Sequence, residues 1–331
     1  MPERQNSSDL VEWRPARPED GPVWVALTRE GLTPMVPSEA LAEPDSRSNR
    51  DRQEMREELK RFLREPPPIF GQRFLLWRAS RPVGRLCFRV RNNLAHVGGL
   101  ALLPSLEPDV ITQVARIAIA RAREARTRSV TAAYEARHAA AFAAAGFRET
   151  RRYTPMMAAT RLAEESEEEM ATPIVNTLYQ MRTLDKVGTD ALSELYRAVF
   201  SGGPKPQERS PANWLVEMLL AGSGIDDIAL PECSFVAEFR RPPPSLPRLV
   251  GATLVSRWHG AAMIDDILVQ PRYRRLGVGT NLLRQSILSL RQRGYASVML
   301  VVMEGAPAQD FFRKLGFREV QTSYVEGEYI L

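Results

Sequence analysis

The sequence has few of the residues that build metal sites and disulfide frameworks. Among its 331 residues there are two cysteines, Cys87 and Cys233. Two cysteines so far apart form no disulfide framework, and we expect both to be reduced thiols in the interior. The three histidines, His96, His138 and His259, are scattered, and no Cys/His cluster of the zinc-binding kind is present. We therefore expect no metal cofactor.

Long hydrophobic runs are also missing. No apolar segment is long enough to span a bilayer, and residues 1–9 are polar, unlike the start of a signal peptide. We therefore expect a cytoplasmic protein without a membrane partner. The length of the chain is that of two ordinary domains, so we also expect two hydrophobic cores.

Lysine is scarce in a chain with 45 basic residues and a net charge of +5, so arginine carries nearly all of the positive charge. The arginines are interleaved with Asp and Glu, for example in segments 47–64 and 116–128, as is typical of solvated helix faces. A basic groove studded with aromatic residues is lacking. The charge pattern therefore predicts no nucleic-acid partner.

One segment near the C-terminus combines glycine and arginine in a distinctive context. Its sequence is Arg274-Arg275-Leu276-Gly277-Val278-Gly279-Thr280. An apolar, strand-like run at 263–269 precedes it, and apolar residues recur at helical spacing after it, so this glycine loop is predicted to open a helix. Gly277 and Gly279 allow the backbone to turn and to approach a ligand closely. N–H groups at a helix N-terminus, with two arginines beside them, favour a pyrophosphate.

The spacing of the glycine loop separates it from other phosphate-binding loops. It has neither the Gly-Lys-Ser/Thr of a P-loop nor the three-glycine fingerprint of a dinucleotide fold. Its Arg-x-x-Gly-x-Gly pattern resembles the acetyl-CoA loop of the GNAT superfamily of N-acetyltransferases. Segment 308–317 resembles a second hallmark of that superfamily, a helix that ends in Lys314-Leu315-Gly316-Phe317 with Gly316 as its C-cap. The resemblance covers the C-terminal half of the chain.

The two halves of the chain also resemble each other. Ala145-Gly146-Phe147-Arg148-Glu149 matches Leu315-Gly316-Phe317-Arg318-Glu319, and Phe142 falls on Phe312 at the same offset. Together with the GNAT resemblance, this repeat implies an α/β (α+β mixed sheet) fold. We expect two tandem GNAT-like domains, each with a central mixed β-sheet flanked by helices.

The predicted domains are a degenerate GNAT-like copy at 1–160, an acidic linker at 161–172 and an acetyltransferase domain with the acetyl-CoA site at 173–331. In the first copy, the segment that corresponds to the glycine loop, 105–109, contains neither glycine nor arginine. Glu107 and Asp109 would repel a pyrophosphate there. The N-terminal copy is therefore predicted to have lost the cofactor and to act as a structural or substrate wall. The alternative is a second site with a different ligand preference.

The resemblance implies that a substrate amine attacks the thioester of acetyl-CoA directly. It also implies that strand backbone holds the pantetheine arm and that the glycine loop holds the pyrophosphate. The implied cofactor-binding residues are Ile267, Leu268, Val269, Arg274, Arg275, Leu276, Gly277, Val278, Gly279, Thr280, Phe312 and Lys314. For Lys314, the alternative role is to balance the dipole of its helix.

Two adjacent aspartates are the first candidates for the general base. Asp265 and Asp266 follow each other in the strand-like run, and strand alternation is expected to send them to opposite faces. Asp265 shares a face with Met263, where many GNAT relatives carry glutamate, so we interpret Asp265 as the base or as part of a proton relay through water. The alternative is a structural aspartate bonded to a neighbouring loop. Glu304, at the end of the next strand, is the second candidate.

Two departures from the GNAT pattern concern the leaving group and the cofactor arm. The family often has a tyrosine at the position of Phe312, so protonation of the thiolate falls to Tyr324, Tyr329 or solvent. The family asparagine that bonds the pantetheine arm is replaced here by Gly305. Neither change removes the glycine loop or the strand backbone, so cofactor binding is still expected.

The sequence therefore predicts an acetyl-CoA-dependent N-acetyltransferase whose C-terminal domain acts on a small-molecule or peptide N-terminal amine. We expect a monomer or a homodimer. The alternative is a catalytically silent acyl-CoA-binding protein with a regulatory or interaction role, which the departures at Phe312 and Gly305 favour. The intact glycine loop and Asp265 favour the enzyme.

Overall fold

The computed structural model describes residues 10–32, 71–160, 179–184, 189–200, 227–239, 248–258, 261–320 and 322–331. In these segments, strands and helices follow a similar order in two successive halves. The elements of the N-terminal half are β1 (Glu12–Pro15), η2 (Pro18–Asp20), α1 (Gly21–Leu32), β2 (Gln72–Arg78), β3 (Arg81–Arg91), β4 (Leu94–Leu102), α3 (Pro108–Glu124), β5 (Ser129–Glu135), η3 (Ala136–His138), α4 (Ala139–Ala144) and β6 (Arg148–Ala159). Those of the C-terminal half are β7 (Tyr179–Thr183), α6 (Thr189–Phe200), β8 (Asp227–Ala229), β9 (Phe235–Phe239), β10 (Arg248–Trp258), β11 (Ala261–Val269), η5 (Pro271–Tyr273), α8 (Val278–Gln292), β12 (Ser297–Met303), α9 (Pro307–Lys314), β13 (Arg318–Glu319) and β14 (Tyr324–Ile330).

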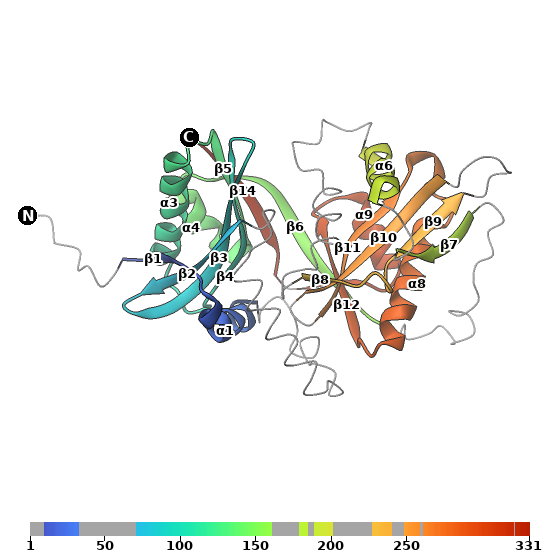
Figure 1. Cartoon of the computed structure of the whole chain (residues 1–331), viewed down its shortest axis with the longest axis horizontal. Helices are drawn as coiled ribbons and strands as arrows, with labels where there is room; N and C mark the ends of the chain where they lie inside the picture. The colour runs from blue at the N-terminus through green and yellow to red at the C-terminus, as the bar shows by residue number, and fades with distance from the viewer. Residues whose placement is uncertain are drawn as a thin grey trace, which may run out of the picture.

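The strands of the described segments form one 14-stranded mixed sheet. Its order is β1-β2-β3-β4-β5-β14-β6-β12-β11-β10-β9-β7, with β8 paired to β10 and β13 paired to β6. The pairs β4–β5 and β11–β12 are parallel. Figure 1 shows two lobes, with α3 and α4 in one and α8 and α9 in the other. The predicted fold class, two tandem units that each contain a mixed sheet flanked by helices, is confirmed.

The two lobes exchange their last strands. β14 is the final strand of the chain, yet it lies between β5 and β6, and Figure 1 shows it beside β5 in the lobe built by the first half. β6 pairs with β14 through residues 148–153 and with β12 through residues 153–159. Val325 of β14 is fully buried in the N-terminal core. No local sequence pattern predicts this exchange, because each strand follows its helix as it would in an unexchanged domain.

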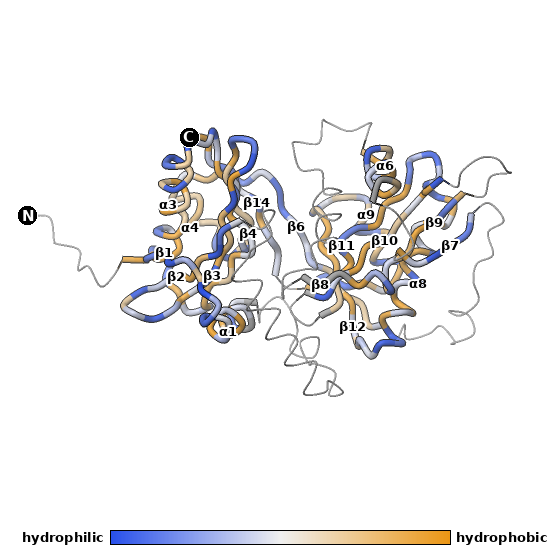
Figure 2. The backbone as a smooth tube through the Cα atoms, viewed as in Figure 1, coloured by the Kyte–Doolittle hydropathy of each residue, from blue (hydrophilic) through white to orange (hydrophobic). Residues whose placement is uncertain are grey.

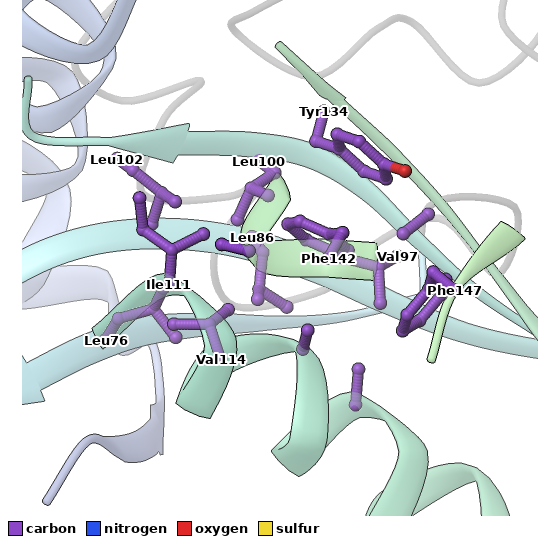
Figure 3. Close-up of a cluster of buried hydrophobic side chains, with 14 of the residues drawn as sticks. Leu76, Leu86, Val97, Leu100, Leu102, Ile111, Val114, Tyr134, Phe142 and Phe147 are labelled. Carbon is purple, nitrogen blue, oxygen red and sulfur yellow. The ribbon is translucent and has the colours of Figure 1, made fainter. Parts of the chain in front are cut away.

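The core of the N-terminal lobe lies between its sheet and the helices α3 and α4. In α3, Val110, Ile111 and Val114 recur at helical spacing and are at most 4% exposed. Figure 3 shows side chains from β2 to β5 converging on Ile111 and Val114 and on Phe142 of α4. The ring of Phe142 stacks on that of Tyr134 with centroids 3.9 Å apart. The first half thus has a packed core of its own, which β14 completes.

Two hydrophobic clusters cover opposite faces of the C-terminal sheet. α8 and α9 pack on one face, where Val255 of β10 is buried. α6 packs on the other, where the neighbouring Leu254 belongs to one buried cluster with Leu192 and Leu195. In Figure 2, β10 and β11 are largely hydrophobic, whereas β6 is hydrophilic at residues 148–152. The face that carries α6 is called the α6 face below.

Some predicted features lie outside the described residues or stay untested. The acidic linker at 161–172 lies in a segment that the structure does not describe, and the domain boundaries remain predictions. Cys87 and Cys233 form no disulfide with each other, and Cys233 is buried. Over the described ranges, no helix is long and apolar enough to cross a membrane. The same residues contain no group of three or more His, Cys, Asp or Glu arranged to hold a metal ion.

Candidate functional site

The parallel strands β11 and β12 are hydrogen-bonded over only part of their length and then separate. They pair only at residues 262–264 with 298–300, although β11 continues to Val269 and β12 to Met303. Met303 is 49% exposed on the part of β12 that does not pair with β11. We call the two segments that do not pair with each other, 265–269 of β11 and 301–303 of β12, the fork.

A register shift marks the vertex of the fork. Val255 of β10 lies opposite Ile264 of β11. The next pair is Leu254 with Asp266, which leaves Asp265 as an extra residue on β11. Such a β-bulge bends its strand and increases the local twist. Because Ile264 is also the last residue of β11 that pairs with β12, the bulge directs the rest of β11 away from β12.

The glycine loop joins the free end of β11 to α8. Arg275 and Gly277 both have left-handed backbone, with φ of 65° and 76°, and α8 begins directly after Gly277. Among the described residues, the backbone N–H groups from Arg275 to Thr280 donate to no protein acceptor. Arg274 folds back, and its Nε donates to the carbonyl oxygen of Val269 at 3.2 Å. The loop is therefore a nest of free N–H groups at the positive end of a helix dipole.

Gly279 faces the fork. A Cβ atom at this position would lie 3.5 Å from Cγ2 of Val269 and 3.9 Å from both Cγ2 of Ile267 and Cζ of Phe311. The first turn of α8, the free end of β11 and α9 thus meet at one point. Phe312, the next residue of α9, is 9% exposed and belongs to the C-terminal core. The aromatic side chain beside Gly279 is therefore Phe311, and a cofactor contact of Phe312 stays a prediction.

The other predicted cofactor residues divide between surface and core. Leu276 is 49% exposed in the glycine loop, and Lys314 is exposed at the end of α9. Val278 and Leu268 are at most 2% exposed, so their side chains serve packing and only their backbone groups are available to a ligand. Their predicted contacts with acetyl-CoA stay predictions.

The corresponding turn of the N-terminal half has a different backbone. β4 and β5 also pair over part of their length, at 94–97 with 129–132, and then separate. However, α3 begins at a proline, and Glu107 before it has a φ of −68°. No residue of 103–109 has positive φ, and Pro108 has no N–H to donate. This turn lacks the nest that the glycine loop forms.

Asp265 and Asp266 lie on the same face of the sheet, so the prediction that alternation separates them is wrong. Oδ1 of Asp265 accepts a hydrogen bond from Oγ of Ser256 at 3.0 Å. Ser256 shares its face of β10 with Leu254, which lies opposite Asp266. The physical reason is the bulge, because an extra residue interrupts the alternation of a strand. Both carboxylates are on the α6 face.

Asp266 is half-buried in a largely apolar environment. It lies opposite Leu254, and its charge contributes, after burial, to raising the pKa of Tyr196 on α6. Burial raises the pKa of Asp266 to about 7, because a carboxylate loses favourable hydration there. Asp266 therefore exchanges its proton near neutral pH. The strand pattern carries no information about burial beneath α6, and Asp265 as the general base stays a prediction.

The structure places Glu304 and Tyr324 on the β12 side of the fork, away from the two aspartates of β11. Glu304 follows β12 and forms an exposed ion pair with Nε of Arg152 at 3.7 Å. Tyr324 begins β14, opposite Glu135 on β5 and Tyr153 on β6. Burial, followed by the charge of Glu135, raises the pKa of Tyr324, which keeps its phenol protonated. Because β6 and β12 lie between β14 and β11, the structure does not bring Tyr324 next to the aspartates.

Tyr329 and Gly305, the remaining positions considered in the sequence, have structural partners. Oη of Tyr329 accepts a hydrogen bond from Nη2 of Arg123 at 3.1 Å, within the N-terminal lobe. The N–H of Gly305 donates to Oε1 of Gln309 at 2.8 Å, in the turn before α9. Tyr329 thus lies with the N-terminal sheet rather than at the fork.

A known protein family matches the part of the chain that forms this site. Residues 192–317 match the model of the Acetyltransferase (GNAT) family. The match lies in the C-terminal half of the chain. It includes the bulge, the fork, the glycine loop and α9, so the elements that form the site lie within the matched region.

Individual relatives agree with the family match. An N-alpha-acetyltransferase of Sulfurisphaera tokodaii is 36% identical over 81 residues, which cover 23% of this chain and 46% of the relative, so the match spans less than half of that protein. Among solved structures, a tandem GNAT protein from the clavulanic acid biosynthesis pathway has a TM-score of 0.66 at 19% identity and covers 97% of this chain and 98% of its own. A GCN5-related N-acetyltransferase from Sphaerobacter thermophilus has a TM-score of 0.65 at 17% identity, with coverages of 99% and 97%. These two structures show that the fold extends over the whole chain.

Proposed function

We propose that the C-terminal GNAT domain transfers an acetyl group from acetyl-CoA to an amine. The observation that carries this proposal is the continuity of the fork with the glycine loop, which leads from a pair of carboxylates to a nest of N–H groups. From the first Cα to the last, segment 265–269 spans about 13 Å, four steps of about 3.3 Å each. An extended ligand with a phosphate at one end and a thioester at the other matches this arrangement.

The glycine loop fits the pyrophosphate of acetyl-CoA. The N–H groups of residues 275–280 have no acceptor among the described residues, and the left-handed backbone of Arg275 and Gly277 forms the concave turn. The helix dipole and the exposed Arg275 add positive potential. Gly279 leaves the approach from the fork open, because it has no Cβ. The loop is thus suited to an anion that arrives along β11.

Backbone groups of β11 fit the pantetheine arm. Ile267, Leu268 and Val269 pair with β10 on one edge only, and their other edge is not paired with β12. The amides of an extended arm are suited to such an edge, as in the addition of a strand to a sheet. Since Leu268 is buried against α6, its contribution is through the main chain.

Acetyl-CoA supplies the acetyl group already activated as a thioester. The protein must accept a proton from the amine and stabilise the charge that develops on the carbonyl oxygen. The carboxylate pair Asp265–Asp266 at the vertex supplies the proton acceptor, and free N–H groups on the β11 edge stabilise the oxyanion. Glu304 is a weaker candidate, because its exposed ion pair with Arg152 holds it at the surface. Protonation of the thiolate falls to solvent, or to Tyr324 acting through water.

The proposed acceptor is a small-molecule or peptide N-terminal amine. Similarity to an N-alpha-acetyltransferase supports the peptide N-terminus. Two carboxylates on the α6 face favour an acceptor that arrives as an ammonium ion. The N-terminal lobe, whose equivalent turn lacks the nest, is proposed to act as a structural or substrate wall. A cytoplasmic location and a monomeric or homodimeric state are retained as proposals from the sequence.

A thiol-release assay tests this function. The purified chain is incubated with acetyl-CoA and, separately, with spermidine, glucosamine, an aminoglycoside and a hexapeptide with a free N-terminus. We expect amine-dependent release of free CoA with at least one acceptor class. Tight calorimetric binding of acetyl-CoA without release for any acceptor would instead support the silent acyl-CoA-binding protein, which the buried Phe312 at the family tyrosine position favours.

A further inference from the structure

The two aspartates at the vertex of the fork have different partners. Asp265 is the bulge residue, and its Oδ1 accepts the hydrogen bond of Ser256, whose side chain is fully buried. A donor held in the interior of the sheet restrains the orientation of the carboxylate. Asp265 is therefore a carboxylate held in place by the sheet.

Asp266 has no such compensation from the described residues. Burial accounts for the raised pKa of its carboxyl group, without a contribution from a cation or a hydrogen-bond donor. Among the described residues, Leu254 of β10 lies opposite Asp266, Asp265 is its chain neighbour, and Tyr196 of α6 lies near enough for the charge of Asp266 to raise its pKa. None of these side chains is cationic. Tyr196 keeps its proton, because its own pKa is raised by burial and by the charge of Asp266.

The position of Asp266 in β11 also distinguishes it from Asp265. Asp266 is the first residue of β11 beyond the bulge, two residues after the last β11–β12 pair at Ile264. It lies at the opposite end of the free segment from the glycine loop, where a thioester would lie if the loop held the pyrophosphate. An ammonium ion entering on the α6 face would supply the cation that the carboxylate lacks.

We propose that Asp266, and not Asp265, takes the proton of the acceptor amine, and that Asp265 is a positioning residue held by Ser256. This assignment rests on the proposed acetyl transfer. The acceptor enters as an ammonium ion and gives one proton to the carboxylate of Asp266. The nitrogen lone pair then forms the C–N bond while the C–S bond breaks. The second proton lost from nitrogen neutralises the thiolate, and Asp266 returns its proton to solvent.

The pH dependence of kcat/KM tests the assignment. For the acceptor of the panel that reacts fastest, the wild-type rate should rise with pH and level off above about 7. Asp266→Asn should lower the rate at pH 7 by about 100-fold, the usual contribution of a general base, and its rate should continue to rise with pH as the amine deprotonates unaided. Asp265→Asn tests the positioning residue: it should lower the rate but keep the pH dependence of the wild type. Hydroxylamine, a nucleophile that is largely neutral at pH 7.5, should react equally well with wild type and with Asp266→Asn.

Calorimetry with acetyl-CoA separates loss of the base from loss of the site. The assignment is supported if Asp266→Asn binds acetyl-CoA with unchanged affinity but its kcat/KM no longer levels off above about pH 7. If Asp266→Asn keeps the wild-type pH dependence of kcat/KM, or if Asp265→Asn loses it, the assignment is overturned while acetyl transfer stands. If the wild type binds acetyl-CoA but transfers to no amine, acetyl transfer and the assignment fail together.

Discussion

Tyr324 lies directly opposite Glu135 in the register between β14 and β5, so the last strand of the chain belongs to the sheet of the first half. In return, residues 153–159 of β6 pair with β12 in the second half. Each lobe is therefore completed by a strand from the other. This exchange makes the stability of the N-terminal lobe depend on residues at the C-terminus.

Val325→Ala should destabilise the N-terminal core although the substitution is near the C-terminus. Val325 is fully buried among the residues of that core, and removing methyl groups from such a site costs about 2 kcal/mol. Ile330→Ala, in the same strand but 74% exposed, is the matched control. Urea unfolding, followed by hydrogen exchange of α3 amides, measures the effect. Equal stability of the two variants would contradict the exchange.

Gly279→Ala should leave the fold intact and weaken acetyl-CoA binding at least tenfold. An added Cβ would make only ordinary contacts with Val269, Ile267 and Phe311, and alanine favours a helix over glycine. The methyl group would, however, project into the fork in front of the N–H nest. Calorimetry with acetyl-CoA and a thermal melt measure both effects, with Gln292→Ala at the far end of α8 as the control. Wild-type affinity in the Gly279 variant would show that the ligand does not pass this residue.

Asp266→Asn should raise stability at pH 8 relative to wild type but not at pH 4. The pKa of this carboxyl is raised from 3.8 to about 7, so between these values the folded protein holds a proton that the unfolded chain releases. Stability therefore falls as the pH rises from about 4 to 7 and is level above that range. The difference amounts to a few kcal/mol at most. Unfolding free energies at pH 4, 6 and 8 check this difference. If the free energy of unfolding changes with pH in the same way for both proteins, Asp266 does not have a raised pKa in the folded state.

His138 should make the N-terminal lobe sensitive to acid. Its side chain is 6% exposed, and its Nε2 has no hydrogen-bond partner among the described residues. Burial, followed by the charge of Arg137, lowers its pKa from 6.5 to about 4. The unfolded chain thus binds a proton between these values that the folded chain does not, so stability falls as the pH drops from 6.5 to 4.

His138→Gln should remove this part of the acid sensitivity, on the order of 2 kcal/mol at pH 4.5. Urea unfolding at pH 7 and pH 4.5 measures it, with His96→Gln as the control, because His96 is only half-buried. An identical loss of stability in wild type and in His138→Gln would show that this histidine is not the acid-sensitive group.

Local features of the site were predictable from the sequence. The backbone freedom of Gly277 and the periodicity of α8 are properties of adjacent residues, and the structure places the loop at the start of the helix as expected. The repeat of the Gly-Phe motif likewise predicted the tandem arrangement that the whole-chain comparisons support.

Non-local features were not predictable in this way. The bulge at Asp265 depends on the register with β10, so strand alternation gave the wrong faces for the two aspartates. The exchange of β14 depends on which sheet edge is available in three dimensions. Phe311 and Phe312 are neighbours in one helix, and only the packing of α9 shows which of them lies beside Gly279.

The most direct test of acetyl transfer at the fork is mass spectrometry of the acceptor amine after incubation with acetyl-CoA and either wild type or Gly279→Ala. We predict that the wild type adds the mass of one acetyl group to the amine and that the variant, although folded, does not. An acceptor that stays unmodified with the wild type, or that is acetylated equally by both proteins, would contradict the account.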